Sequence, residues 1–113
     1  MIRNGLYALS VEIQDGGVGG DHGVVVLRDG TIRGGDSFFY FVGSYRCYGC
    51  KWKGEVISQE HTPALATRLF ARKIATIGFT GIHTDTGAES DNTALLGKRS
   101  VRFKTILRLL VAD

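Results

Sequence analysis

Proline, cysteine and long apolar runs are all scarce in this chain. Its 113 residues include 1 proline and 2 cysteines but 16 glycines, a balance that suits turns and strand bends and works against long helices. No segment approaches the ~20 apolar residues of a membrane-spanning helix, and the N-terminal stretch lacks the apolar core of a signal peptide. We therefore expect a cytoplasmic protein whose cysteines stay reduced.

Charges of both signs are present, and neither sign is concentrated in one segment. The formal net charge is +3 at pH 7, with 22% charged and 43% apolar residues, which is typical of a globular domain. A nucleic-acid-binding protein usually gathers its lysines and arginines on one face, whereas here they are scattered along the chain. The sequence predicts a single domain over residues 1–113 without a membrane partner. Direct nucleic-acid binding by the basic residues Arg102, Lys104 and Arg108 is a third and less favoured possibility.

Short strands joined by tight turns account for most of the sequence. Leu6–Ile13 alternates apolar and polar side chains with the period of two that a half-buried strand shows. Two further strands, Val24–Leu27 and Thr31–Arg33, flank Asp29-Gly30, a dipeptide suited to the positive φ angles of a hairpin turn. The other strands are expected over residues 38–46, 52–59, 75–83, 93–96 and 101–109. Residues 15–22 and 84–92 are glycine-rich or polar, and we interpret both as loops.

These strands predict an all-β fold, an eight-stranded antiparallel up-and-down β-barrel that leaves no exposed sheet edge. The stretch 60–73 is ambiguous because Pro63 is favoured in the first turn of a helix. We interpret it as a connection that can include one short helix. A barrel of about eight strands is just wide enough to be filled by its own side chains or to hold one small ligand.

Aromatic residues crowd both faces of one predicted strand, residues 38–46. We expect Phe39 and Phe41 to point into the barrel, and Phe38 and Tyr40 to cover a partner or dimer surface, to which we add Tyr48. The inward residues either fill the core or line a pocket for a small apolar ligand. Core filling is favoured, and the candidate pocket residues are Tyr7, Leu9, Val11, Phe39, Phe41, Phe103 and Leu107.

No motif indicates catalysis. Cys47-x-x-Cys50 lies between two predicted strands, whereas a redox motif of this spacing usually opens a helix. A structural zinc site needs four ligands, and the three histidines are isolated in the sequence. His83-Thr84-Asp85 resembles a base with its orienting carboxylate, but no nucleophile accompanies it. We expect a plain hairpin turn at Cys47–Cys50, and neither enzymatic activity, a cofactor nor a metal.

Several turn and core motifs together resemble a known family, the small negative regulators of bacterial type III secretion typified by the repressor of the Ler activator. The similarity covers residues 4–46 and is loose from residue 51 onward. It is carried by Asn4-Gly5-Leu6-Tyr7, Asp29-Gly30, Gly34-Gly35-Asp36, Gly43-Ser44-Tyr45 and Phe103-x-x-x-Leu107-x-Leu109.

The resemblance implies a lipocalin-like barrel that forms a homodimer and represses transcription by binding a transcriptional activator protein. The best-studied members carry an acidic four-residue patch after the aromatic strand, and this chain has Cys47-Tyr48-Gly49-Cys50 there, with no acid. Two functions are therefore favoured. The first is a regulator that acts by protein contact, and the alternative is a carrier or sensor of a small hydrophobic ligand.

Overall fold

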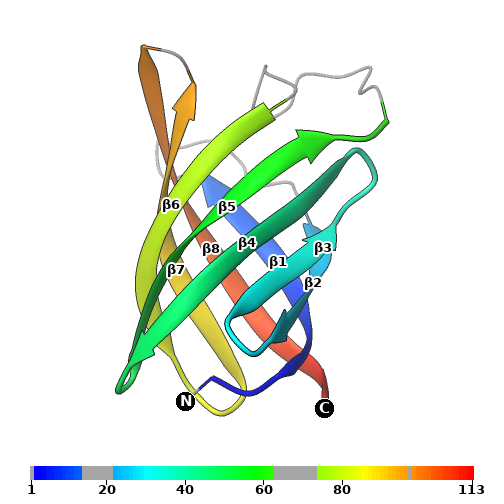
Figure 1. The fold of residues 1–113 in the computed structure, drawn as a ribbon, viewed down its shortest axis with the longest axis vertical. Helices are drawn as coiled ribbons and strands as arrows, with labels where there is room; N and C mark the ends of the chain where they lie inside the picture. Colours follow the sequence, from blue (N-terminus) through cyan, green and yellow to red (C-terminus); the bar gives the residue numbers. More distant parts are fainter. Residues whose placement is uncertain (1, 14–21, 63–73, 97) are drawn as a thin grey trace.

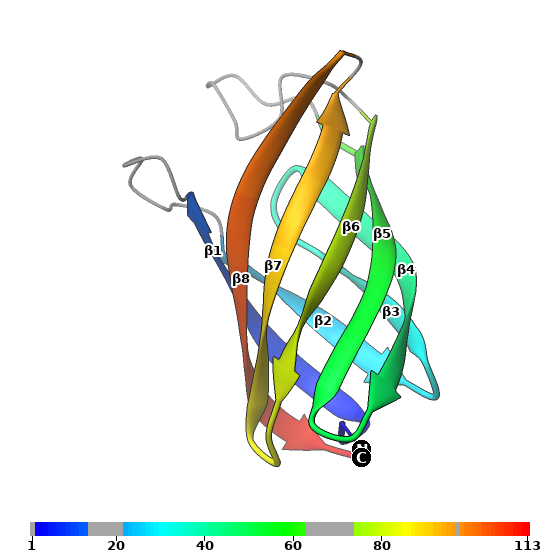
Figure 2. The same ribbon diagram turned by 90° about the vertical axis from the view of Figure 1, so that its left-hand side faces the viewer.

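The computed structural model describes residues 2–13, 22–62, 74–96 and 98–113. Its strands pair in chain order and close into one antiparallel barrel (Figures 1 and 2), which confirms the predicted fold. Closure is made by β1, which pairs with β2 on one side and with β8 on the other. The strands are β1 (Gly5–Ile13), β2 (His22–Arg28), β3 (Thr31–Gly35), β4 (Phe39–Tyr48), β5 (Lys51–Glu60), β6 (Ile74–His83), β7 (Gly87–Leu96) and β8 (Arg99–Ala112).

Both predicted tight turns are present. Asp29 and Gly30 join β2 to β3 with φ angles of 49° and 83°, the conformation that a two-residue hairpin requires. Gly49, with φ of 61°, lies in the turn between β4 and β5. The buried residue His83 stabilises this second turn. Its backbone N–H donates to the Cys50 carbonyl (2.8 Å) and its Nε2 donates to the Gly49 carbonyl (2.9 Å).

The prediction of a polar loop over residues 84–92 is wrong, because β7 already begins at Gly87. Its inward positions are buried but small or polar, as Ala88, Ser90 and Asn92 show. The strand therefore has the usual alternation of buried and exposed residues, but its buried residues are not the large apolar ones by which a strand is usually recognised in a sequence. The other strands mostly extend beyond their predicted bounds, and β8 runs from Arg99 to Ala112.

Two sequence predictions fall largely outside the described residues. The glycine-rich loop at residues 15–22 overlaps the undescribed stretch 14–21, and the possible short helix at 60–73 overlaps 63–73. Within the described part of the chain, no helix is long and apolar enough to cross a membrane.

Residues 2–4 run across the lower end of the barrel, where both termini lie (Figure 1). Ile2 is buried there in the main core cluster. The hydroxyl of Tyr7, a fully buried side chain, donates to the Arg3 carbonyl at 2.6 Å. Burial raises the pKa of this phenol above its ordinary value, so it remains a neutral donor. The Asn4 side chain bonds both the backbone N–H (3.0 Å) and Oδ1 (3.1 Å) of Asp29.

Large side chains fill the lower half of the barrel above this segment. The Trp52 ring packs against Phe79 at a tilt of 59°, with ring centroids 4.6 Å apart, and meets Tyr45 edge-on at 5.8 Å. The Trp52 indole N–H donates to the Glu89 carbonyl at 3.0 Å. The lower half is thus a packed core. Its buried members are Ile2, Tyr7, Val25, Leu27, Ile32, Tyr45, Trp52, Phe79, Ala88 and Leu107.

Gly54 is the position where this packing demands a glycine. It pairs with Phe79 on β6, and a Cβ at Gly54 would lie 2.9 Å from the Phe79 ring and overlap the Ser44 carbonyl oxygen. Gly78 lies one residue before Phe79 and faces solvent, and a Cβ there would have no neighbour within 4 Å.

We therefore expect Gly54→Ala to lower the free energy of unfolding by about 3 kcal/mol, because overpacking forces backbone and rings apart. Gly78→Ala should leave it unchanged or raise it by about 0.5 kcal/mol, since alanine restricts the unfolded chain more than glycine does. Urea denaturation followed by Trp52 fluorescence measures both variants. Equal effects of the two substitutions would contradict this account of the packing.

Candidate ligand-binding cavity

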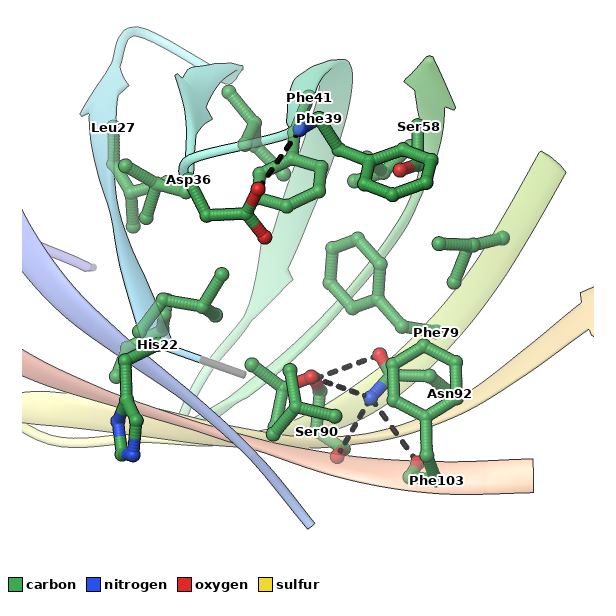
Figure 3. Close-up of a pocket in the computed structure, with 18 of the residues that line it drawn as sticks. His22, Leu27, Asp36, Phe39, Phe41, Ser58, Phe79, Ser90, Asn92 and Phe103 are labelled. Atoms are coloured by element: carbon green, nitrogen blue, oxygen red, sulfur yellow. Dashed lines mark hydrogen bonds between the residues drawn. The ribbon is translucent and has the colours of Figure 1, made fainter. Parts of the chain in front are cut away.

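The upper half of the barrel is only partly filled, by a second cluster of the buried residues Ile77, Ala94 and Phe103. A cavity of about 100 Å³ lies above the packed core, and side chains from all eight strands line it (Figure 3). Small residues on β5, β6 and β7 leave this space open, since Ser58, Ala75, Ser90 and Ala94 are all buried at inward positions. Asp36 and the exposed His22 lie at its rim.

The structure places six of the seven residues predicted for a pocket on the cavity wall: Leu9, Val11, Phe39, Phe41, Phe103 and Leu107. The seventh, Tyr7, is buried lower down against the N-terminal segment. That these residues bind a ligand stays a prediction. The polar members of the wall, Ser58, Ser90, Asn92 and Thr105, were not anticipated. The only sequence signal for these polar residues is their position in the period-two alternation of their strands, which places them on the inward face.

Asn92 of β7 is the centre of a polar network on one wall, drawn as dashed lines in Figure 3. The two protons of its Nδ2 are shared among three acceptors, the carbonyls of Phe103 (3.1 Å) and Ser90 (3.3 Å) and Thr105 Oγ1 (2.8 Å). Its Oδ1 accepts from the Ser90 hydroxyl at 2.9 Å. The buried amide is thus fully satisfied, as a polar group in a barrel interior must be.

Ser58 of β5 presents the opposite case. Its side chain is 1% exposed, and its hydroxyl is the buried side-chain polar atom that lacks a hydrogen-bond partner among the described residues. Its direct neighbours across the ladders are Phe41 on β4 and Ala75 on β6. Neither neighbour has a polar side-chain atom, so within the described part of the chain nothing compensates the desolvation of this hydroxyl.

Asp36 connects β3 to β4 at the rim. Its Oδ1 accepts the backbone N–H groups of Phe38 (2.9 Å) and Phe39 (2.8 Å), which fixes the start of β4 and points Phe39 inward. Figure 3 shows the other carboxylate oxygen turned toward the cavity. Asp36 and His22 are the titratable residues among the described lining residues, and none of these is a lysine or arginine.

The residues predicted for a partner surface are separate from this cavity. Tyr40 and Tyr48 face outward from β4 with 40% and 52% of their surface exposed. Phe38 lies just before β4 and is partly buried, and its carbonyl accepts the N–H groups of His61 and Thr62. Tyr48 also lies under the Lys53 ammonium, 5.2 Å from the ring centroid.

In the described structure, the two cysteines and three histidines do not come together as a metal site. Cys47 is half-buried and Cys50 is exposed, and both are free thiols. His61 bonds to the Asp36 carbonyl at 3.1 Å, while His83 binds the Gly49 carbonyl. Among the described residues, no three His, Cys, Asp or Glu side chains come close enough to share a metal ion.

A scan against protein-family models and a search of curated proteins each found no match to this chain. The resemblance to secretion regulators therefore rests on the sequence motifs alone.

The two buried serines of the cavity should respond to alanine in opposite directions. Ser58→Ala removes an uncompensated hydroxyl and should raise the free energy of unfolding by about 1 kcal/mol. Ser90→Ala leaves Asn92 Oδ1 without its donor and should lower it by about 1–2 kcal/mol. Denaturant titration of both variants is the measurement, and a loss of stability in Ser58→Ala would show that this hydroxyl has a partner.

Proposed function

We propose that this protein binds a small apolar molecule inside its barrel, as a carrier or sensor and not as an enzyme. The observation that carries the proposal is the cavity in the upper half, which is lined by phenyl rings and aliphatic side chains and lies above the packed core. Apolar pockets with a few inward polar groups are typical ligand sites. A barrel of eight strands can be filled by its own side chains, as the lower half is. The cavity above is therefore not a necessary result of the strand number.

The size of the cavity limits the ligand. An apolar cavity of about 150 Å³ engineered into another protein takes up benzene. The cavity here, at about 100 Å³, suits a five-membered ring or a short branched alkyl group. A longer ligand would have to leave part of its length outside the rim formed by Asp36 and His22.

Binding can be tested with cyclopentane as the probe. We expect the indole N–H resonance of Trp52, the only tryptophan, to shift as cyclopentane is added, because this ring lines the cavity floor. Val56→Phe, on the cavity wall, should abolish the shift because the new ring occupies the space. Thr93→Phe is the matched control, because Thr93 is exposed on the outer face of β7.

An unchanged spectrum of the wild-type protein at saturating cyclopentane would refute the proposal. So would a response that survives in Val56→Phe, since the probe would then be bound elsewhere.

A row of exposed apolar residues on the outer wall supports a second function, contact with another copy of this chain. Val42 on β4 pairs directly with Ile57 on β5, and they are 46% and 50% exposed. Tyr40 and Ile74 continue the row on either side of Gln59, and the Tyr40 hydroxyl donates to Gln59 Oε1 at 2.8 Å. Apolar surface that spans neighbouring strands commonly marks an interface, and two-fold pairing is the commonest assembly.

Sedimentation equilibrium at micromolar concentration tests this second proposal. We expect a dimer that Ile57→Lys converts to a monomer, since the ammonium would be buried without a partner. Val111→Lys is the control, because Val111 is 61% exposed on β8, outside the row. A monomeric wild-type protein would exclude the dimer. The role in repressing transcription, through this face or the Tyr48 turn, stays a prediction supported by the resemblance.

A further inference from the structure

The polar wall of the cavity has a defined set of proton donors. The Asn92 amide orientation is fixed because its Nδ2 faces two backbone carbonyls, those of Phe103 and Ser90, which only accept. Its Oδ1 must then accept, so the Ser90 hydroxyl proton is directed at it. Nδ2 also lies 2.8 Å from Thr105 Oγ1, and an amide nitrogen donates but does not accept.

Thr105 is therefore left with an uncommitted proton. Its oxygen accepts from Asn92, and among the described residues no acceptor receives its own O–H. Thr105 lines the cavity and is only partly buried, whereas Ser58 Oγ is covered completely. The hydroxyl that a ligand can reach is thus a donor, held in place by a buried amide.

The charges around the cavity restrict the ligand further. No lysine or arginine is found among the described lining residues, and the one carboxylate, Asp36, is at the rim. An anionic ligand would enter past this carboxylate and lose its hydration without gaining a cation. An ammonium group would meet Asp36 only at the rim, and no further carboxylate is found among the described lining residues.

We propose that the ligand is a compact apolar molecule with one neutral acceptor oxygen, such as a ketone, aldehyde or lactone carbonyl. The Thr105 hydroxyl donates a hydrogen bond to this oxygen while the hydrocarbon part fills the space between Phe39, Phe103 and Val56. This inference rests on the proposed ligand-binding function, and it adds the chemical class of the ligand and the residue that recognises it.

The test compares four probes of one ring size: cyclopentane, cyclopentanone, cyclopentanecarboxylate and cyclopentylammonium. In the wild-type protein we expect cyclopentane and cyclopentanone to bind and the two ions to leave the Trp52 resonance unchanged. Thr105→Val keeps the shape of the side chain and removes the donor, and Asn92 Nδ2 retains its two carbonyl acceptors. We expect the dissociation constant of cyclopentanone to rise roughly five-fold in this variant, with that of cyclopentane unchanged within about two-fold.

Two further variants separate recognition from structure. Thr105→Ser keeps the hydroxyl and should restore cyclopentanone affinity. Thr93→Val should leave the affinity of both neutral probes unchanged, because Thr93 is exposed on the outer face of β7.

The outcomes are distinguishable. If no probe binds the wild-type protein, the ligand-binding function itself fails. If cyclopentane binds but Thr105→Val weakens both neutral probes equally, or weakens neither, the function stands and the recognition by Thr105 is wrong. Binding of cyclopentanecarboxylate or cyclopentylammonium as tight as that of cyclopentanone would overturn the ligand class, and this comparison needs only the wild-type protein.

Discussion

The pairing of β1 with β8 is the constraint on which the rest of the structure depends. It closes the sheet, so one side of every strand is enclosed and the other is left to solvent. Thr105 lies at this seam, opposite Val11 on β1 and Ser90 on β7. Once the register is set, the inward side chains have a fixed volume to fill. The rings around Trp52 fill it in the lower half, and the small residues Ser58 and Ser90 leave it open above.

Turn chemistry and apolar alternation were sufficient to predict the barrel. Asp29-Gly30 located the first hairpin, and the alternation in Leu6–Ile13 located β1, because both signals act locally and with strict geometry. Residues 87–92 were missed for a physical reason. A strand whose inward residues are Ser90 and Asn92 is stabilised by a hydrogen-bond network to β8, and this compensation does not show in the sequence of β7 alone.

The candidate site was only half predictable for a related reason. Large apolar residues such as Phe39 and Phe103 face inward because side chains alternate along a strand, and this alternation is visible in the sequence. Whether such residues fill the barrel interior depends on the size of the side chains across the barrel, which belong to strands distant in the sequence. The lower end of the barrel shows the same limit, since residues 2–4 have no strand pattern and yet place Ile2 in the main core cluster and supply the Arg3 carbonyl that accepts from Tyr7.

The position of the cavity across the seam has a consequence for folding kinetics. Gly5 pairs with Ala112, so β1 and β8 close the longest loop in the chain, and such non-local pairing is slow to form. The wall that carries Thr105 is complete only when β1 and β8 have paired. A ligand bound there, as proposed above, would have affinity for the closed barrel alone. It would therefore slow the opening of the seam and leave the rate of closure unchanged.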